Sequence, residues 1–407
     1  MSTELFPDLN DQQQSFIINI GSNFAPQVIV HAVSKEDAQK KAVAEMERIA
    51  NMHFGSLLMA LNAYLVGSGQ SQSWHLGLKP QVFVDIKDVD KVDRKDTYVA
   101  APSNTVLVAF RKTNNVTTDY VVAIAGTNAN SAYATFTEDG KVIHLDKWPY
   151  GDTGVKDVRI AKGSRDGVDA LLYKMGDSLV DYLAGISDEN INLIFTGHSL
   201  GGGLCPALAL AIMNPGTKVA QQVIDNAKTF KWTSLIQPTA APDIGNAGFV
   251  SSVEALFKPQ KGTSPFVYNR KIWNSLDMVP HAWSQHYLKE INTLYDDDGL
   301  KTPGYVKCLI DTIDDAIRLA NLGNPYRSLD PKKESQFKGK FKKFNNCSDC
   351  KDVPEGLCEF MTEVLYQHIP AYAIAFGLPK QFADLFPAPN GCAAAQSLYI
   401  KDSPCAL

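Results

Sequence analysis

The stretch Asn192-Leu-Ile-Phe-Thr-Gly-His-Ser-Leu-Gly-Gly202 decides the fold that this sequence predicts. Residues 193–196 are apolar or β-prone and predict a buried strand, and residues 204–213 predict a helix. Between them lies the pattern Gly-x-Ser-x-Gly, with Ser199 at its centre. In a strand–turn–helix context this pattern predicts a nucleophile elbow, a tight turn that strains the serine backbone and exposes its hydroxyl. The two glycines of the pattern remove clashes that side chains would make there.

Length and composition limit the classes of protein to consider. The 407 residues can bury one large core or a core with insertions. A hydrophobic content of 45% and a charged content of 20% are typical of a soluble globular protein. The formal net charge of −5 gives no general attraction to nucleic acid, so no nucleic-acid partner is expected. No apolar run approaches the roughly 20 residues of a membrane span, so no transmembrane segment is expected.

The two ends of the chain give opposite indications of its compartment. The N-terminus lacks the basic start and apolar core of a signal peptide, which favours a cytoplasmic protein, although a processed or engineered start would look the same. The cysteines suit secretion instead. Cys205 is expected as a buried thiol on the helix after Ser199, and the other six form an even number that suits three disulfides. The sequence is therefore compatible with either compartment.

Two alternatives to disulfides stay open for these six cysteines. They are free thiols, or a zinc site that uses Cys347-x-x-Cys350. No histidine follows this pair at zinc-finger spacing and no second pair has the same spacing, so disulfides are favoured and no metal is expected. Asn115 and Asn346 each begin a triplet that can accept an N-linked glycan.

Strand and helix patterns alternate through residues 105–213, which predicts an α/β fold with a mostly parallel central sheet covered by helices on both faces. Strands are predicted at residues 105–111, 120–125, 193–196, 233–237 and 267–273. Helices are predicted at residues 34–67, 164–184, 204–213, 306–322 and 361–376. Ser34 caps the first helix, and His53 on its apolar face is expected to be a packed core histidine.

No internal repeat or low-complexity linker divides the chain, so residues 1–407 are predicted to form a single domain. Within it we expect an amphipathic helix at 34–67, a core at 105–283, an insertion at 284–360, and a C-terminal helix with a cysteine-containing tail at 361–407. The insertion holds a segment, residues 337–342, in which lysine and phenylalanine alternate as in an exposed β-hairpin. A solvated hairpin is the simpler interpretation, and contact with an anionic lipid surface is the alternative.

A serine hydroxyl is a weak nucleophile and needs a base, which in turn needs a carboxylate to orient it. After a nucleophile elbow the acid usually precedes the histidine in the chain. Asp277 directly follows a predicted strand and is favoured as the acid over Asp243, whose surroundings suggest a turn and a helix start. His368 comes from a separate segment and is favoured as the base. The remaining candidates are His281, which shares the loop of Asp277, and His286.

The oxyanion that forms during acyl transfer needs donors fixed in advance. The backbone N–H of Leu200 is the first expected donor, because it begins the helix after the nucleophile. Thr127, which follows Gly126 at the end of a predicted strand, is expected to supply a second donor from its backbone and a third from its hydroxyl. This chemistry needs no cofactor, and none is expected.

These residues resemble the fungal-type class 3 lipases of the α/β-hydrolase superfamily. The matching pieces, in chain order, are Ala125-Gly-Thr127, Gly197-His-Ser-Leu-Gly-Gly202, Pro242-Asp-Ile-Gly-Asn246 with Phe249, Asp277-x-Val-Pro280, and His368 followed by Tyr372. The resemblance implies Ser199, Asp277 and His368 as a catalytic triad and lipid esters, typically acylglycerols, as substrates. It also implies a lid after Thr127. The residues expected to bind substrate or belong to the lid are Asn128, Trp148, Tyr150, His198 and His281.

The chain differs from that family pattern at two positions. Ala125 replaces the usual arginine before the oxyanion turn, and Asp243 stands where a basic residue is common. We expect a serine carboxylic ester hydrolase, a triacylglycerol lipase above all, that contacts a lipid–water interface transiently. The alternatives are a phospholipase A1, a short-chain or feruloyl-type esterase, and, from another class, a non-catalytic lipid-binding or signalling module on the same fold.

Overall fold

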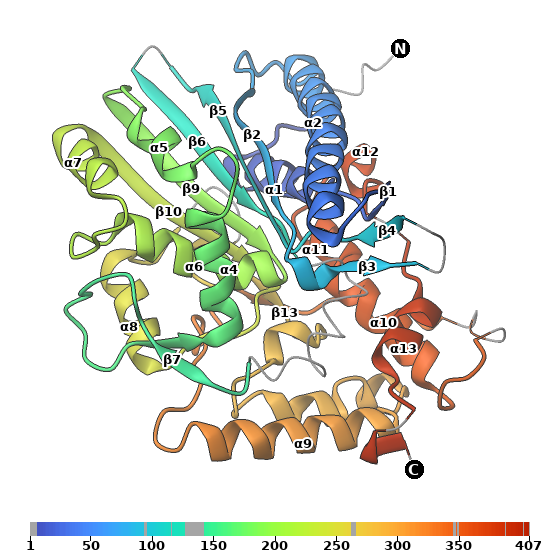
Figure 1. Cartoon of the computed structure of the whole chain (residues 1–407). Coiled ribbons are helices and arrows are strands. Elements are labelled where there is room, and N and C mark those ends of the chain that lie inside the picture. Colours follow the sequence, from blue (N-terminus) through green and yellow to red (C-terminus); the bar gives the residue numbers. More distant parts are fainter. Residues whose placement is uncertain are drawn as a thin grey trace.

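A five-stranded sheet forms the centre of the protein (Figure 1). The structure, a computed structural model, describes residues 6–92, 96–114, 116–126, 142–261, 266–344, 347, 350–386, 388–401 and 403–406. The strands lie in the order β10 (Lys231–Thr239), β9 (Asn190–His198), β6 (Thr117–Ile124), β5 (Asn104–Lys112) and β2 (His75–Phe83). The strand predicted at residues 193–196 is β9, which lies between two parallel neighbours, β10 and β6.

The other strand pairs of this sheet are antiparallel. β5 pairs antiparallel with both β6 and β2. Only residues 113–116 separate β5 from β6, which is too short for the crossover that parallel neighbours need. The sheet is therefore mixed, where the sequence predicted a mostly parallel one.

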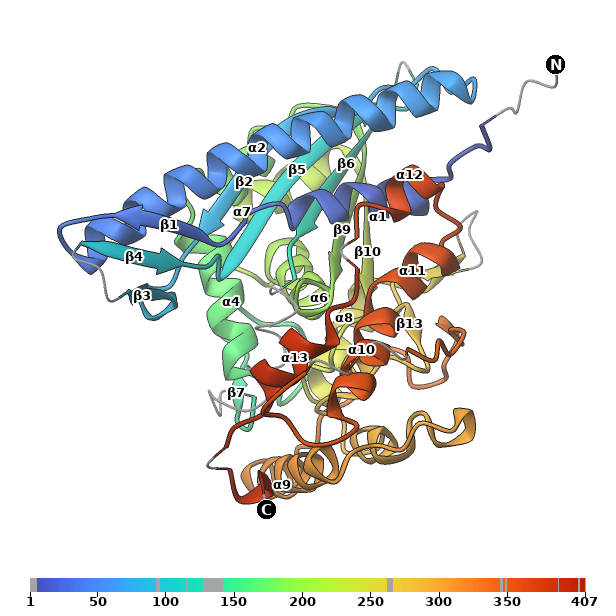
Figure 2. The ribbon, with the colours of Figure 1, turned by 90° about the vertical axis from the view of Figure 1, so that its right-hand side faces the viewer.

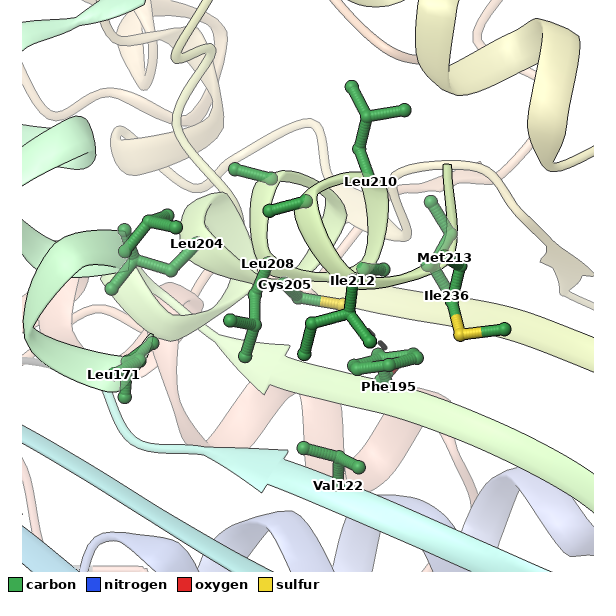
Figure 3. Close-up of a cluster of buried hydrophobic side chains, with 14 of the residues drawn as sticks. Val122, Leu171, Phe195, Leu204, Cys205, Leu208, Leu210, Ile212, Met213 and Ile236 are labelled. Atoms are coloured by element: carbon green, nitrogen blue, oxygen red, sulfur yellow. Dashed lines mark hydrogen bonds between the residues drawn. The ribbon is translucent and has the colours of Figure 1, made fainter. Parts of the chain in front are cut away.

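Helices on one face of the sheet surround α6 (Leu200–Met213), the predicted helix after Ser199. They are α4 (Lys162–Tyr173), α5 (Leu179–Ala184), α7 (Gln221–Thr229) and α8 (Ala247–Leu256). Figure 3 shows how Leu208 and Ile212 of α6 pack over Phe195 of β9. Cys205 is a buried free thiol, as predicted, and donates to the Phe195 carbonyl. The single helix predicted at residues 164–184 is two helices, because Ser178 caps a new one.

The opposite face of the sheet is covered by α1 (Asp11–Ser22) and α2 (Lys35–Gly67), as Figures 1 and 2 show. Side chains alternate along the strands, so Leu107, Val121 and Ile194 face these two helices while their neighbours face α6. The prediction of helices on both faces is therefore confirmed.

The first of these helices, α1, was missed in the sequence. Asn10 caps it in a capping box with Gln13, in which each side chain accepts from the backbone N–H of the other residue. Arg111 of β5 anchors its N-terminal half, because the buried guanidinium donates to Asp11 and Gln14 of α1. The C-terminal half of α1 is thereby held against the strand ends that lead to Ser199.

The second helix, α2, begins as predicted, with the Ser34 side chain accepting from the N–H of Asp37. His53 is exposed, so the prediction of a packed core histidine is wrong. The buried face of α2 passes through Ala50 and Phe54, one position away from the predicted face at this point. The N-terminal half of α2 packs on a small sheet formed by β1 (Val28–His31), β4 (Thr97–Ala100) and β3 (Val89–Lys91).

Among the described helices, α2 is long and apolar enough to cross a membrane by length and composition alone. Polar residues interrupt its apolar run, which is why no membrane span was expected from the sequence. Within its most apolar window, 39% of the residues are buried inside the protein, against the sheet and α1. A core helix passes the same test, and the absence of a membrane span stays a prediction.

The C-terminal third of the chain forms a second core, built by α9 (Gly304–Ala320), α10 (Leu357–His368) and α13 (Gly391–Leu398). α11 (Pro370–Ala375) and α12 (Lys380–Ala383) follow α10. The helix predicted at residues 361–376 is broken between α10 and α11, because the proline ring at position 370 cannot continue a helix. The predicted hairpin is wrong: beyond β14 (Gln336–Phe337), residues 338–344 form neither helix nor strand.

Phe337 and Phe341, which suggested the hairpin, pack into two different cores instead.

The other short strands are β7 (Leu145–Lys147), β8 (Arg159–Ala161), β11 (Gln260–Lys261), β12 (Val267–Tyr268) and β13 (Trp273–Asn274). The 3-10 helices are η1 (Ile86–Asp88), η2 (Val279–His281), η3 (Leu288–Thr293), η4 (Asp296–Asp298) and η5 (Pro404–Ala406).

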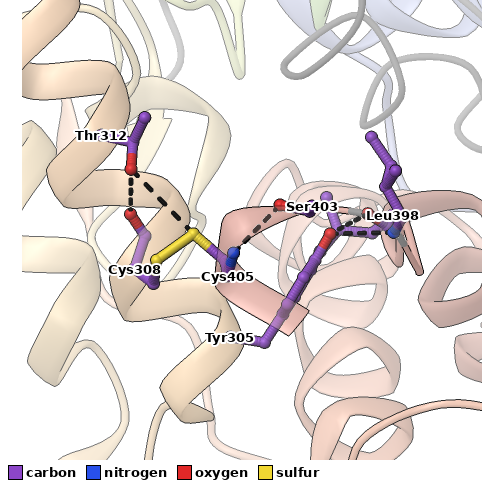
Figure 4. The surroundings of a disulfide bond; sticks show 7 residues. Tyr305, Cys308, Thr312, Leu398, Ser403 and Cys405 are labelled. Atoms are coloured by element: carbon purple, nitrogen blue, oxygen red, sulfur yellow. Dashed lines mark hydrogen bonds between the residues drawn. A yellow bond between two sulfur atoms is a disulfide. The ribbon is translucent and has the colours of Figure 1, made fainter. Parts of the chain in front are cut away.

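Three disulfides tie this C-terminal region together, as the sequence favoured. They join Cys308 to Cys405, Cys347 to Cys358, and Cys350 to Cys392. Figure 4 shows the first, which fixes the chain end to α9 beside the hydrogen bond from the Tyr305 hydroxyl to the Leu398 carbonyl. The one group of potential metal ligands found among the described residues is Cys350, Cys358 and Cys392, and all three are in disulfides. Asn115 and Asn346, the two possible glycan acceptors, lie outside the described residues.

Candidate active site

Ser199 lies at the sharp turn between β9 and α6. Its backbone has φ +59° and ψ −128°, in the left-handed half of conformational space that strains any residue except glycine. A Cβ at Gly197 would strike the backbone of Gly201, and a Cβ at Gly201 would strike the end of β6. The glycines that the sequence singled out are therefore required by the close approach of these backbones.

The structure brings Ser199, His368 and Asp277 into one hydrogen-bonded chain. His368 is the last residue of α10, and its Nε2 lies 2.9 Å from the Ser199 Oγ. Its Nδ1 lies 2.9 Å and 3.1 Å from the two carboxylate oxygens of Asp277. The carboxylate can only accept, so Nδ1 carries a proton and leaves Nε2 free to accept from the serine hydroxyl. All three side chains are buried.

The Asp277 carboxylate is held by two further donors. The N–H of Val279 donates to Oδ1 at 3.0 Å, and the Tyr372 hydroxyl donates to Oδ2 at 2.9 Å. Burial, and then the negative charge of Asp277, raise the pKa of the Tyr372 hydroxyl well above its ordinary value. The hydroxyl therefore stays protonated and remains a donor. In its turn it accepts from the N–H of Asn274, which fixes its position.

His198, next to the nucleophile, supports the backbone of His368. Its Nε2 donates to the His368 carbonyl at 2.8 Å, and its Nδ1 lies 3.0 Å from the Thr239 hydroxyl. Burial, and then the neighbouring charge of His368, lower the pKa of His198 well below its ordinary value of 6.5. The ring is therefore neutral, with its proton on Nε2. The predicted contact of His198 with substrate stays a prediction.

Of the two residues predicted to supply oxyanion donors, the structure describes Leu200 but not Thr127. Leu200 is the first residue of α6, so its N–H is one of the helix's first four, which have no partner within the helix. Thr127 and Asn128 lie outside the described residues, as does the predicted lid up to residue 141. Gly126, directly before Thr127, is described: a Cβ there would lie 2.8 Å from the His198 carbonyl oxygen and 3.2 Å from the Ser199 Cβ. The chain that leads into Thr127 thus passes beside the nucleophile.

Two asparagines of the α1 region hold the strand ends at this site, and the sequence analysis missed both. The Asn19 amide donates to the Ile124 carbonyl at 3.0 Å. The Asn23 side-chain oxygen accepts from the N–H of Gly126 at 3.0 Å. The signal that leads to them is the Asn10-x-x-Gln13 capping box before an apolar run, which marks α1 but not where it docks.

A cavity of about 430 Å³ opens beside Ser199, His198 and His368. Much of its wall is apolar and comes from α1, the segment after it, the segment before β5, and the segments after α10 and α12. These apolar residues are Phe16, Ile20, Phe24, Ala25, Pro26, Pro102, Ile369, Leu385 and Phe386. A hydrophobic wall next to a nucleophile suits an apolar substrate group.

Three other residues that were predicted to bind substrate or form the lid do not line this cavity. Trp148 packs against the core around α6, and Tyr150 is buried there with its hydroxyl donating to Asp169. His281 lies behind Asp277, where its Nδ1 donates to the Asp277 carbonyl at 2.7 Å. All three make contacts of the core or of the loop that carries the acid.

Asp243, the competing candidate for the acid, belongs to a buried ion pair. Its Oδ1 lies 2.6 Å from the Lys271 Nζ, which also donates to the Pro280 carbonyl at 2.9 Å. Asp243 therefore anchors the loop after Asp277 through Lys271, and burial raises its pKa.

The strand predicted at residues 267–273 is interrupted by Asn269, whose φ is +65°. Its side-chain oxygen accepts from the N–H of Ile236 in place of a strand backbone. Asp277 consequently follows the short β13 rather than a strand of the central sheet.

Comparisons with known proteins bear on the family and the fold. The family model described as "Lipase (class 3)" matches residues 121–287. A search among curated proteins finds no match. Among solved structures, the M37 lipase is 20% identical, with a TM-score of 0.63 over 95% of this chain and 98% of its own. This likeness shows a shared fold.

Two fungal lipases match less of the chain. The nonglycosylated LIP2 lipase of Yarrowia lipolytica is 15% identical, with a TM-score of 0.37 over 66% of this chain and 72% of its own. The lipase of Rhizopus microsporus var. chinensis is 14% identical, with a TM-score of 0.33 over 70% of this chain and 76% of its own. The chain has the α/β-hydrolase fold, and its residues 121–287 match the model of the class 3 lipase family.

Proposed function

We propose that the protein is a serine carboxylic ester hydrolase that cleaves lipid esters through an acyl-enzyme, and that triacylglycerols are its main substrates. The observation that carries the proposal is the hydrogen-bonded chain from the Ser199 Oγ through His368 to the Asp277 carboxylate. The class 3 lipase match supports ester hydrolysis, and the apolar cavity beside Ser199 supports a lipid acyl group.

The first half of the reaction acylates the enzyme. The Ser199 Oγ attacks the ester carbonyl carbon while its proton passes to the His368 Nε2. Asp277 stabilises the imidazolium that results, and its three donor partners hold the carboxylate in place. The N–H of Leu200, at the positive end of α6, donates to the oxyanion, with Thr127 as the proposed second donor. His368 then gives the proton to the leaving alcohol, and the acyl group stays on Ser199.

The second half returns the enzyme to its starting state. Water attacks the acyl carbonyl as the His368 Nε2 takes one of its protons, and the proton returns to the Ser199 Oγ when the carboxylic acid leaves. His198 keeps the imidazole of His368 within reach throughout, through its hydrogen bond to the His368 carbonyl. Each turnover consumes one ester and one water and releases one alcohol and one acid.

The test is a panel of nitrophenyl esters from acetate to palmitate, together with emulsified triacylglycerol, for the wild type and Ser199→Ala. We expect the wild type to hydrolyse esters and Ser199→Ala to lose at least about 10⁴-fold in kcat, because the remaining groups cannot supply a nucleophile. A wild type without ester turnover would favour a non-catalytic lipid-binding module. Retained activity in Ser199→Ala at unchanged thermal stability would remove Ser199 from the mechanism.

A further inference from the structure

A second cavity, of about 610 Å³, lies between α2 and α12 on the side of the sheet away from α6. Figure 2 shows α1, α2 and α12 together on that side. On α2 the wall is formed by His53, Ser56, Leu57, Ala60, Ala63 and Tyr64. The remaining wall comes from Phe6, Phe24, Gln381, Phe382 and Leu385. Both this cavity and the one beside Ser199 fall in the range of about 300–1,000 Å³ that is usual for small-molecule sites.

The two cavities share walls. Phe24, which follows α1, and Leu385, which follows α12, line both of them. The Phe24 ring meets the His53 ring of α2 edge-on at 6.0 Å between centroids, which places Phe24 at the boundary with α2. The two cavities therefore adjoin at these two side chains.

The second cavity has the chemistry of an apolar binding site. None of its lining residues is an aspartate, glutamate, lysine or arginine. Between Arg48 and Lys79 the sequence contains no such residue at all, whereas the N-terminal half of α2 is densely charged. Large apolar side chains on this uncharged half of α2 also stay exposed, among them Met52 and Val66. An uncharged surface that continues an active-site cavity suits a hydrocarbon chain.

We propose that the groove formed by α2, α12 and Phe24 binds the distal part of the substrate's acyl chain, while the ester carbonyl lies at Ser199. The occupant is a long fatty acyl group that runs from Ser199 past Phe24 and Leu385 to the Ala60 and Ala63 side of α2. This assignment rests on the proposed function. Such a groove gives the enzyme a preference for long acyl chains, because each methylene that moves from water into an apolar groove raises the binding constant about fourfold.

The test fills the groove and leaves the triad untouched. Ala60→Trp places a bulky ring in the groove from an exposed helical position, so the fold should tolerate it. Met59→Trp is the matched control, because Met59 is the next residue of α2, is 68% exposed and lines neither cavity. For each variant, kcat/KM is measured on nitrophenyl acetate and on nitrophenyl laurate kept below its solubility limit. Acetate turnover and the melting temperature report an intact site and fold.

We expect Ala60→Trp to lower kcat/KM for laurate at least tenfold and to leave acetate within twofold, while Met59→Trp changes neither. An unchanged laurate-to-acetate ratio in Ala60→Trp would overturn the inference and leave the proposed function standing. A loss confined to emulsified substrate would overturn it in favour of a lipid surface as the occupant. If the wild type elutes as a dimer in size-exclusion chromatography and Ala60→Trp elutes as a monomer, the inference would be overturned in favour of a second copy of this chain. A wild type that hydrolyses no ester would overturn the proposed function itself.

Discussion

At the scale of single residues, the site depends on side chains that act through the triad rather than on substrate. Tyr372 and the N–H of Val279 both donate to Asp277, so the carboxylate has three partners and no freedom to turn away from His368. His198 donates to the carbonyl of His368 from the other side. A hydrogen bond to a charged group contributes about 1.5–3 kcal/mol to stability, so the bond from Tyr372 to Asp277 offsets the cost of burying the tyrosine hydroxyl.

The buried His198 makes stability depend on pH. Its folded-state pKa lies below the ordinary value of 6.5, so between these two values the unfolded chain binds a proton that the folded chain does not. His198 therefore contributes stability above pH 6.5, and this contribution is lost as the pH falls towards its folded-state pKa, by at most about 1.4 kcal/mol per pH unit. We expect His198→Gln to flatten the fall in unfolding free energy below pH 6.5, measured by urea denaturation at several pH values.

The control for this prediction is the same substitution at His75, an exposed histidine of β2. His75→Gln should leave the pH dependence of stability as in the wild type. If His198→Gln shows the same slope below pH 6.5 as the wild type, His198 is not the group that titrates.

At the scale of elements, α1 holds the strand ends beside the active site in position, and we call it the brace of the site. Arg111 fixes its N-terminal half to β5, and Asn19 and Asn23 join its C-terminal end to the end of β6. The end of β6 leads into Thr127, the proposed oxyanion donor. Through α1, the end of β6 and Gly126 are held by hydrogen bonds between residues more than 100 positions apart in the chain.

Removing the acceptor at Asn23 tests this brace. We expect Asn23→Ala to lower kcat about tenfold or more with little change in KM, because a displaced oxyanion donor weakens transition-state binding, which is worth about 2.7–4 kcal/mol per donor. Asn23→Asp keeps an oxygen that can accept from the Gly126 N–H and should restore most of the activity. A rise in KM at unchanged kcat would mean that Asn23 contacts substrate and does not position the turn.

At the scale of the whole molecule, the base of the triad is carried by a region that disulfides hold together. His368 ends α10, and the cysteines at 347 and 358 join the start of α10 to the segment before it. The bond between Cys308 and Cys405 joins residues 97 positions apart and fixes the C-terminal end to α9. A cross-link over so long a loop restricts the unfolded chain strongly.

Replacing both Cys308 and Cys405 by serine should therefore lower the free energy of unfolding by about 2–5 kcal/mol. The measurement is denaturant unfolding monitored by tryptophan fluorescence, with ester hydrolysis at low temperature as a check that the native site survives. Cys205→Ala, which removes a thiol without removing a cross-link, is the control and should cost less. Equal loss in the two variants would show that the cross-link itself adds nothing.

Local patterns in the sequence were enough to predict the candidate catalytic residues. Gly-x-Ser-x-Gly between a strand and a helix requires one backbone geometry, and the structure has it at Ser199. Few histidines follow this turn, which made His368 and Asp277 tractable choices, and the structure brings both to Ser199, although their catalytic roles stay predictions. The capping residue of α2 and the number of disulfide-compatible cysteines were likewise readable, because each depends on neighbours in the chain or on composition.

The tertiary structure alone decided what surrounds this centre. The docking of α1, the two asparagines on the strand ends, the donor from Tyr372 and the groove on α2 all join segments far apart in sequence. The hairpin at residues 337–342 and the buried His53 were wrong for the same reason, since periodicity shows which residues share a face but not what that face meets. A nucleophile elbow is a local steric requirement, whereas its brace and its substrate groove exist only once the chain has packed.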